Sequence, residues 1–459
     1  MSRTTMSSQV SMKPIRIGMI GAGTVGGGVY EIIMGRLRSQ MKHQTNSSFS
    51  SPPSKGFSNP SIRPCIISKI CVQDITKPRS FQIDREATSV VMDINSIVED
   101  ESIDIIVEVM GGVGIAKAAV LESLKRGKSV VSANKALVSE CLDEIRHAAL
   151  HSESKFAYEA AVCGGIPVIQ ALQTCFTGDI IHELMGICNG TTNYMLGKME
   201  EGVDYDEALK EAQELGFAEA DPTADVEGHD VRAKIAILAK LAFGTTVNVD
   251  SIPCMGITDL SSVDFEYAKL LGCTIKLIGT AERLSDFGEH DGDLSVYVAP
   301  KLVPIPHLLS TTRGAGNAVA IISANLGITS YTGPGAGRFP TANSVVSDIC
   351  RVAFGGACSD PFPLTSNIEI DNDYASAFYI RITFHDELGI IRRVGELAEI
   401  NGVSICSVLQ NPIKDRMSAD FVITTEECKF SQVQQMCEDI GAQDFAHNVP
   451  IFMPMLQSS

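Results

Sequence analysis

The chain has 459 residues, 44% of them hydrophobic and 20% charged, which is typical of a globular protein of several domains and excludes disorder along its whole length. Its 37 basic and 55 acidic residues give a formal net charge of −18, so it lacks the basic field that nucleic acid or an acidic membrane requires. No apolar run approaches the roughly 20 residues of a membrane span, and residues 1–12 lack the apolar core of a secretory signal. We therefore expect a soluble cytoplasmic protein, although the Ser-rich, acid-poor residues before Lys13 also permit an organelle-targeting segment.

The chain's 13 cysteines contain no CxxC pair and lie mostly in apolar runs. Disulfide frameworks and zinc sites both need clustered cysteines. We therefore predict buried free thiols in a reducing compartment.

The first segment predicts a strand, a glycine turn and a helix. The apolar residues 15–20 precede the sequence GAGTVGGG, and residues 29–34 have helical spacing. In a dinucleotide fold, Gly21 would make the tight turn, Gly23 would let backbone amides approach a pyrophosphate, and Gly26 would let the helix pack closely on the strand. The alternative is an ordinary tight turn, but the flanking strand and helix favour the dinucleotide site.

The rest of residues 14–155 continues this pattern. Residues 66–72, 103–109 and 129–132 are predicted strands and residues 115–125 a helix, which together indicate a parallel, doubly wound α/β sheet. Residues 43–61 are poor in apolar side chains, so we expect a mobile surface insert. Asp74 at the end of the second strand favours NAD, whereas Lys77 and Arg79 favour NADP, so the choice of cofactor stays open.

The segment 156–332 has a different, α+β texture. Residues 180–188 alternate as a strand, and residues 189–192 open a helix that continues from Tyr194. We predict a capping box formed by Asp204 and Glu207, with Gly216 ending that helix, and one apolar helix over residues 226–243. Residues 333–358 read as a return to the first domain, with helical spacing over residues 345–353.

The end of the chain predicts a separate small domain. Residues 359–375 form a polar linker, and residues 376–457 follow a βαββαβ pattern. About 80 residues suffice for a small core of their own.

Two lysines are candidates for chemistry. Asp230 and Lys234 share one helix face at i, i+4, where such a pair is usually a minor surface ion pair. The face around Lys234 is apolar, which predicts a desolvated amine that exchanges a proton near neutral pH while Asp230 orients it. Lys135 lies just after a predicted strand, where it either faces a cofactor cleft or is a solvated loop lysine.

Two further strings suggest an amino-acid site. The acidic cluster 219–222 would hold a substrate ammonium, and residues 189–191 would present amides and a hydroxyl to a carboxylate at a helix start. In isolation both strings are more often ordinary turns and caps.

The chain resembles the homoserine dehydrogenase family along nearly its whole length. The strings that carry the resemblance are residues 21–26 (GAGTVG), 107–112 (VEVMGG), 132–136 (SANKA), 158–162 (YEAAV), 164–167 (GGIP), 189–194 (NGTTNY), 219–222 (EADP), 225–230 (DVEGHD) with Lys234, and 333–337 (GPGAG) with 340–342 (PTA). The resemblance implies oxidation of L-homoserine to L-aspartate 4-semialdehyde with NAD or NADP, run in reverse in threonine, methionine and isoleucine biosynthesis.

The family's site residues carry over by motif. The resemblance implies that Lys234 is the proton donor and that Lys135 is its active-site partner, which also touches the cofactor. The implied homoserine ligands are Glu219, Asp230, Gly190 and Thr191. The implied cofactor positions are Gly21, Gly23, Thr24, Val25, Gly26, Lys135, Gly216 and Gly337. A monovalent cation, usually sodium, would be held by Glu159 and by main-chain oxygens of Val162, Gly164 and Ile166.

The C-terminal pattern resembles an ACT domain, a small ligand-sensing module, with Asp386 and Gly389 at its first strand-to-helix turn. This implies feedback binding of L-threonine and a homodimer or homotetramer. Two alternatives stay open: a non-catalytic Rossmann and ACT regulatory protein that senses amino acids, and a dehydrogenase for a related amino-acid alcohol or semialdehyde.

Overall fold

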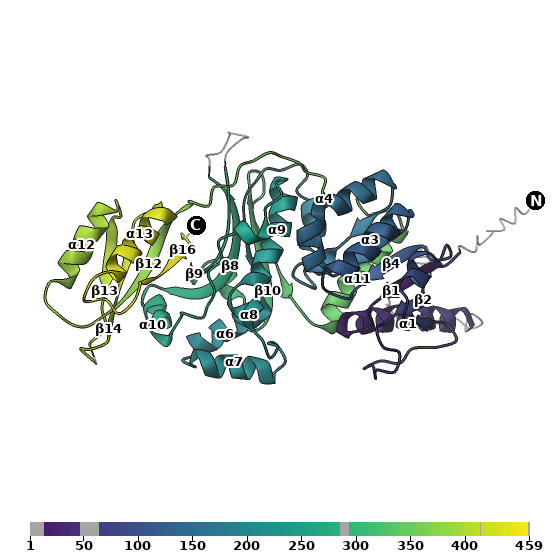
Figure 1. Cartoon of the computed structure of the whole chain (residues 1–459), viewed down its shortest axis with the longest axis horizontal. Helices are drawn as coiled ribbons and strands as arrows, with labels where there is room; N and C mark the ends of the chain where they lie inside the picture. Colours follow the sequence, from purple (N-terminus) through teal and green to yellow (C-terminus); the bar gives the residue numbers. More distant parts are fainter. Residues whose placement is uncertain (1–12, 46–63, 285–292, 414, 458–459) are drawn as a thin grey trace, which may run out of the picture. The chain divides into compact units, whose positions relative to one another are not determined.

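The structure, a computed structural model, describes residues 13–45, 64–284, 293–413 and 415–457. Two compact units make up the chain: residues up to Gly164 with Gly337–Pro361, and Gly165–Ala336 with the residues from Phe362 onward. Figure 1 labels their helices and strands. Among the described residues, no helix is both long enough and apolar enough to cross a membrane. The 13 cysteines are free thiols.

The first unit is a parallel sheet covered by helices. Its strand order is β3-β2-β1-β4-β5-β6, the doubly wound arrangement of dinucleotide-binding folds. The strands are β1 (Ile15–Ile20), β2 (Cys65–Cys71), β3 (Ser89–Val91), β4 (Ile105–Glu108), β5 (Ser129–Ser132) and β6 (Phe156–Ala157). The helices are α1 (Thr24–Thr45), α2 (Asn95–Val98), α3 (Gly114–Lys125), α4 (Lys135–His151) and α11 (Arg338–Ala353), with the 3-10 turn η1 (Glu159–Ala161). The predicted α/β class is confirmed, and β3, β6, α2, α4 and η1 are additions to the predicted elements.

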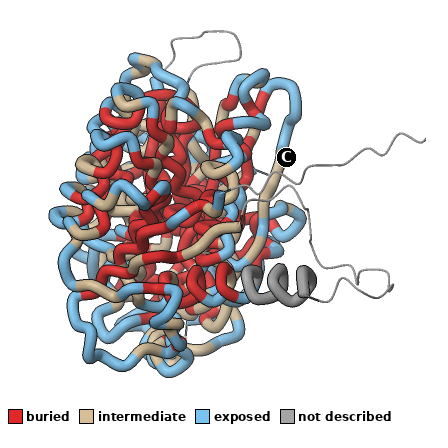
Figure 2. Tube along the Cα trace, turned by 90° about the vertical axis from the view of Figure 1, so that its right-hand side faces the viewer, coloured by how far each residue is buried: buried red, intermediate tan, exposed pale blue. Residues whose placement is uncertain are grey.

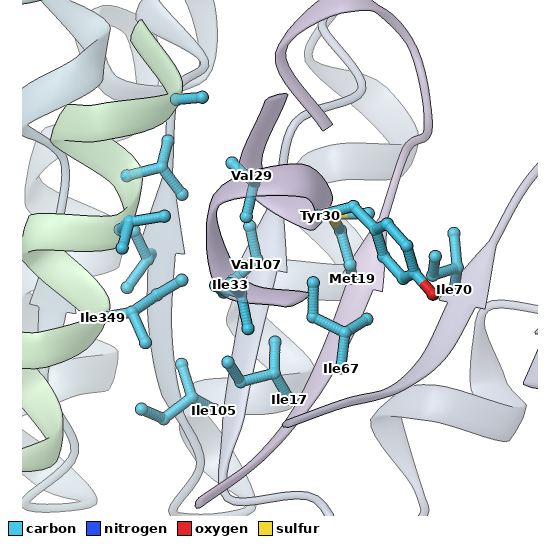
Figure 3. Close-up of a cluster of buried hydrophobic side chains, with 14 of the residues drawn as sticks. Ile17, Met19, Val29, Tyr30, Ile33, Ile67, Ile70, Ile105, Val107 and Ile349 are labelled. Atoms are coloured by element: carbon cyan, nitrogen blue, oxygen red, sulfur yellow. The ribbon is translucent and has the colours of Figure 1, made fainter. Parts of the chain in front are cut away.

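Alternating side chains of β1 place helices on both faces of this sheet. Ile17 and Met19 are fully buried in a core that includes residues of α1 and α11 (Figure 3), whereas Gly18 faces Ile97 of α2. Ile349 of α11 enters the same core, so a helix encoded near residue 340 completes the domain that begins at β1. Of the predicted insert at residues 43–61, the first three residues continue α1, and the others lie outside the described residues.

The second unit is built on a mixed, mainly antiparallel sheet in the order β11-β10-β7-β8-β9-β16-β12-β14-β13. The strands are β7 (Ile181–Ile187), β8 (Cys273–Arg283), β9 (Leu294–Pro304), β10 (Gly316–Ser323), β11 (Gly327–Pro334), β12 (Ala375–Phe384), β13 (Ile405–Leu409), β14 (Ala419–Thr425) and β16 (Ile451–Met455), and the short β15 (Cys428–Lys429) pairs with β12. The helices are α5 (Val168–Thr174), α6 (Gly190–Glu200), α7 (Tyr205–Glu214), α8 (Thr223–Val226), α9 (His229–Phe243), α10 (Ser262–Leu270), α12 (Ile390–Ile400) and α13 (Phe430–Gly441), with 3-10 turns η2 (Val249–Ser251) and η3 (Leu308–Thr311).

The last part of the chain has the predicted βαββαβ order, from β12 to β16, with β15 added. Met455 of β16 pairs with Leu302 of β9, and Tyr297 and Ala299 of β9 belong to the same buried cluster as the apolar side chains of β12, α12 and α13. Residues 376–457 therefore share a sheet and a core with β9. Buried stretches, drawn in red in Figure 2, alternate with exposed turns along the chain.

Three local predictions in this unit differ from the structure. Residues 226–243 form two helices, because Gly228 adopts a φ of +80° between α8 and α9. Asp204 is the N-cap of α7 but makes no side-chain capping bond, so the predicted capping box with Glu207 is absent from this described helix. The helix predicted from Tyr194 begins earlier, at Gly190, because Asn189 caps it with its side chain.

Candidate active site

Lys234 is largely withdrawn from solvent, as predicted, with 13% of its side chain exposed. Its Nζ donates a hydrogen bond of 2.7 Å to Oδ2 of Asp230 and another of 2.7 Å to the carbonyl oxygen of Cys188. Cys188 follows β7 directly, whereas both charged residues lie on α9. These two acceptors fix the direction of a tetrahedral nitrogen, which a surface ion pair does not do.

Asp230 lies in the first turn of α9, directly after the break at Gly228. Backbone amides at a helix N-terminus stabilise a negative charge. A Cβ on Gly228 would lie 2.9 Å from the sulfur of Cys254, so the turn that aims Asp230 has no room for a larger residue. The wrongly predicted single helix would have placed Asp230 in a helix interior, without this stabilisation.

Asn189 joins the helix starts of the site. Its Nδ2 donates to Oδ1 of Asp225 at 2.6 Å and to Oδ2 of Asp230 at 2.8 Å, and its Oδ1 accepts a 2.8 Å bond from the backbone N–H of Thr192. Sequence reasoning assigned only a backbone role to this residue and overlooked Asp225. An asparagine directly before a helix start is a preferred N-cap, which is the signal that points to a side-chain role.

Gly190 and Thr191 form the first turn of α6, next to Asn189. A Cβ on Gly190 would lie 2.7 Å from the carbonyl oxygen of Ala315, so the neighbouring loop packs directly on its backbone. The hydroxyl of Thr191 donates a 2.7 Å bond to the carbonyl oxygen of Phe217. This hydroxyl hydrogen therefore anchors the loop after α7 and does not face outward for the predicted contact with a carboxylate.

The predicted residue Glu219 lies exposed in that same loop, where its carbonyl oxygen accepts a 3.1 Å bond from Gln213. Gly216 begins the loop. Hydrogen bonds thus tie Lys234, Asp230, Asn189 and the α6 start into one cluster, and Glu219 is attached to it through the backbone at Phe217.

The glycine turn borders a cavity of about 750 Å³ in the first unit. Its lining includes Gly21, Gly23, Thr24 and Asp74. Gly21 has a φ of +109° and a Cβ on it would lie 2.6 Å from the carbonyl oxygen of Val109, whereas a Cβ on Gly23 would meet nothing within 4 Å. The turn is therefore packed from behind at Gly21 and open in front at Gly23, which fits a pyrophosphate at the N-terminus of α1.

Other predicted cofactor residues belong to helix starts of this unit, whereas Gly216 follows α7 in the second unit. Thr24 and Val25 are the first residues of α1, Gly26 follows them, and Gly337 is the N-cap of α11. Asp74 lies in the loop after β2, where Thr76 donates to its Oδ1 from both the backbone, at 2.7 Å, and the hydroxyl, at 2.6 Å. These hydrogen bonds hold the pKa of Asp74 below its ordinary value, so the cavity has a fixed negative charge there.

Lys135 is the first residue of α4, after the N-cap Asn134. Asn134 donates a 2.6 Å bond to the carbonyl oxygen of Gly112, which connects the loops that follow β4 and β5. Glu108, fully buried at the end of β4, accepts bonds from the Ser132 hydroxyl at 2.6 Å and from the Met110 amide at 2.8 Å. Glu108 is a site-building residue that sequence reasoning did not identify; a carboxylate at the end of a buried parallel strand was its signal.

The predicted cation ligands lie where the two units join in sequence. Glu159 is buried in η1, with Nη1 of Arg351 3.8 Å from its carboxylate, and the carbonyl oxygen of Gly164 accepts a 2.7 Å bond from the Ser344 hydroxyl. Val162 precedes two residues of positive φ, Cys163 and Gly164, whereas Ile166 is the second residue of the second unit. One carboxylate and three carbonyl oxygens suit a hard cation better than a transition metal.

Comparison with known proteins agrees with this geometry. A family model described as homoserine dehydrogenase matches residues 167–350, and one described as homoserine dehydrogenase, NAD binding domain, matches residues 21–159. The homoserine dehydrogenase of Bacillus subtilis is 36% identical over 441 residues, which cover 94% of this chain and 96% of that protein. The chain belongs to the homoserine dehydrogenase family. The resemblance drawn from the sequence motifs is thereby confirmed.

Solved structures of homoserine dehydrogenases have the same fold. The structure of a homoserine dehydrogenase from Thiobacillus denitrificans superposes with a TM-score of 0.84 at 30% identity, over 97% of this chain and 99% of that one. The structure of a putative homoserine dehydrogenase from Archaeoglobus fulgidus has a TM-score of 0.62 at 29% identity. The match covers 99% of that chain but only 74% of this one. That solved chain therefore matches only about three quarters of the present one.

Membership of the homoserine dehydrogenase family makes the protein an NAD(P)-dependent oxidoreductase and identifies residues 21–159 as its NAD-binding domain. The non-catalytic alternative has no support from these relatives.

Proposed function

We propose that the protein interconverts L-homoserine and L-aspartate 4-semialdehyde with a nicotinamide cofactor bound at the glycine turn. The observation that carries the proposal is the contact of a largely buried Lys234 with both Asp230 and the Cys188 carbonyl, beside the start of α6. A site of this kind can hold a small amino acid and move one proton. When bound, the nicotinamide accepts or returns the hydride.

Lys234 exchanges the proton of the substrate hydroxyl. As a neutral amine it removes this proton during oxidation, and the resulting ammonium is stabilised by the Asp230 carboxylate and the Cys188 carbonyl. In the reductive direction it returns the proton to the alkoxide oxygen. Acid–base catalysis of this kind contributes about 10² to 10⁴-fold.

The amino-acid end of the substrate is held by groups of opposite charge. We assign the substrate carboxylate to the backbone amides of Gly190 and Thr191 at the start of α6, because helix N-termini bind anions. Glu219, exposed in its loop, binds the substrate ammonium. Lys135, Gly216 and Gly337 contact the cofactor, and Asp74 and the Lys77 and Arg79 cations set the choice between NAD and NADP in opposite directions.

The other family properties enter as parts of the same proposal. A sodium ion is bound by four oxygen ligands, from Glu159, Val162, Gly164 and Ile166. We therefore expect activity to depend on Na⁺ rather than on divalent metals. The βαββαβ region binds L-threonine as an effector and pairs between subunits in a cytoplasmic homodimer or homotetramer.

Reduction of NAD or NADP by the purified protein, followed by absorbance with L-homoserine, D-homoserine, L-serine and L-threonine in parallel, tests the activity. We expect turnover with L-homoserine at least about tenfold above the other alcohols, since a site that pairs charged groups discriminates strongly. Turnover with another alcohol alone would make the protein a different amino-alcohol dehydrogenase. Absence of turnover, with tight cofactor binding, would return it to the regulatory alternative.

A further inference from the structure

A second lysine of the substrate unit, Lys276, is more deeply buried than Lys234. It lies on β8 with 1% of its surface exposed, and its Nζ donates to Oδ1 of Asn193 and to the carbonyl oxygen of Thr312, both at 2.9 Å. Burial lowers its pKa to about 8, helped by the charge of Arg313. A buried cation bonded to neutral oxygens is expensive, so its presence calls for a reason.

The first of its acceptors, Asn193, is hydrogen-bonded to the loop of residues 312–316. Its Nδ2 lies 3.3 Å from the Thr312 carbonyl oxygen, 2.9 Å from that of Gly314 and 3.2 Å from that of Gly316. Lys276 and Asn193 together therefore satisfy three carbonyl oxygens of this loop, those of Thr312, Gly314 and Gly316. Besides the turn bond from the Gly316 amide to the Arg313 carbonyl oxygen, these side-chain bonds hold the loop, which has no regular secondary structure between η3 and β10.

This loop is in direct contact with the candidate substrate site. The carbonyl oxygen of Ala315 lies against Gly190, leaving no space for a side chain there. Asn193 also belongs to the first turns of α6, where its backbone N–H donates a 3.2 Å bond to the carbonyl oxygen of Asn189. Lys276 thus holds the start of α6 from two sides, through Asn193 within the helix and through the loop that packs on Gly190.

We propose that Lys276 is a positioning residue for the reaction: it fixes residues 189–193 and 312–316 so that the amides at Gly190 and the Asn189 side chain are aimed at the substrate and at Asp230. This proposal rests on the proposed function. It assigns to Lys276 an effect on the binding of the amino-acid substrate and none on the cofactor, which the first unit binds.

The chain contains a matched control for a purely structural lysine. Lys301 of β9 pairs directly with Lys276 of β8 and is also buried, with 2% exposed. Its Nζ donates a 2.8 Å bond to the hydroxyl of Tyr297 on its own strand, away from α6. Methionine at either position removes a buried ammonium from the same sheet face. Only Lys276→Met removes an ammonium that is hydrogen-bonded to α6 and to the loop packed on Gly190.

The experiment compares Lys276→Met and Lys301→Met with the full-length wild type. We expect Lys276→Met to raise the KM for L-homoserine about tenfold or more, the value of one or two lost charge-assisted bonds, with a smaller change in kcat and an unchanged KM for the cofactor. Lys301→Met should leave the KM for homoserine within about twofold of the wild-type value. This should hold even if its melting temperature falls as much as that of Lys276→Met. Equal effects of both variants on this KM, or none of Lys276→Met, would overturn the proposal.

Two further measurements keep the test decisive. Amide hydrogen exchange should quicken at residues 189–193 and 312–316 in Lys276→Met and not in Lys301→Met, a result that does not depend on the identity of the substrate. If Lys276→Met does not fold, Asn193→Ala leaves the lysine in place and should give the same pattern of KM and exchange. Wild-type turnover with homoserine tests the proposed function separately, so that failure of that function leaves the exchange result interpretable.

Discussion

The side-chain amide of Asn189 donates a hydrogen bond of 2.8 Å to Oδ2 of Asp230. The same oxygen accepts the 2.7 Å bond from Nζ of Lys234. Because the second contact of Nδ2 is with Asp225 at 2.6 Å, Asn189 holds two carboxylates side by side and determines which way Asp230 faces. A short polar side chain at a helix start therefore controls the geometry of the proposed acid–base group.

Replacement of Asn189 by alanine should disturb this geometry without removing Lys234. The two carboxylates would lose their common donor and repel each other, so Asp230 would turn from the amine. We expect kcat for homoserine oxidation to fall about 10- to 100-fold, with the cofactor Kd unchanged. Asn248→Ala, which removes another asparagine cap, at η2, is the matched control and should keep kcat. A near-normal kcat for Asn189→Ala would refute this role.

Substitution of Lys234 distinguishes proton transfer from simple ion pairing. Lys234→Ala should lower kcat about 10² to 10⁴-fold. Lys234→Arg can still contact Asp230, but a guanidinium does not lose its proton in proteins, so this variant should be nearly as slow. Steady-state kinetics with homoserine, together with cofactor titration, provides the comparison. An active Lys234→Arg enzyme would mean that positive charge suffices and that Lys234 does not transfer a proton.

Much of the fold could be predicted because local patterns and tertiary structure agree in the first unit. The apolar run at residues 15–20, the glycine turn and the helix after it appear in the structure as β1 and α1, since parallel strands buried on both faces are short apolar runs bounded by turns. The same rule explains the strands that were missed. β8 and β9 are buried along nearly their whole length, so they lack the two-residue alternation that marks a half-exposed strand.

The site could be predicted only in part. Lys234 and Asp230 could be predicted because their i, i+4 spacing and apolar surroundings are visible in the sequence. The roles of Glu108, Asn189 and Lys276 depend on contacts between residues that are far apart in the chain, such as Lys276 with Asn193, at a separation of 83 residues. The hydrophobic periodicity of a sequence indicates helices and strands, but it does not indicate contacts between distant residues. The break at Gly228 was missed because glycine within a helical pattern is often tolerated.

Asp74 is the residue through which cofactor preference should be changed. Its carboxylate is fixed by Thr76 in the cavity of the glycine turn, where it would accept ribose hydroxyls but repel an additional phosphate. We expect Asp74→Ala to raise the ratio of kcat/KM for NADP over NAD by about tenfold or more. Arg79→Ala should move this ratio the opposite way. An unchanged ratio in both variants would mean that the adenosine end binds elsewhere.

Two glycines of the turn should respond differently to alanine. At Gly21 a Cβ would meet the Val109 carbonyl oxygen at 2.6 Å with φ at +109°, so Gly21→Ala should lower the melting temperature. At Gly23 nothing lies within 4 Å, so Gly23→Ala should keep the melting temperature but weaken cofactor binding about tenfold, because its methyl group would occupy the space of the pyrophosphate. Melting curves and cofactor titrations separate the two effects. Tight cofactor binding by Gly23→Ala would exclude this position for the phosphates.

Glu183 should make the stability of the second unit depend on pH. It lies on β7 directly opposite Glu282 of β8, and burial raises its pKa from 4.5 to about 7, with the charge of Glu282 adding to this and Lys301 opposing it. Between these pH values the folded protein retains a proton that the unfolded chain has lost, so stability falls as pH rises through the window. Glu183→Gln removes this penalty and should be about 2 kcal/mol more stable relative to wild type at about pH 8 than at about pH 5. Melting temperatures at both pH values measure the difference, and Glu214→Gln, at an exposed position, should show none. A constant offset between Glu183→Gln and wild type across this range would show that Glu183 keeps its ordinary acidity in the folded protein.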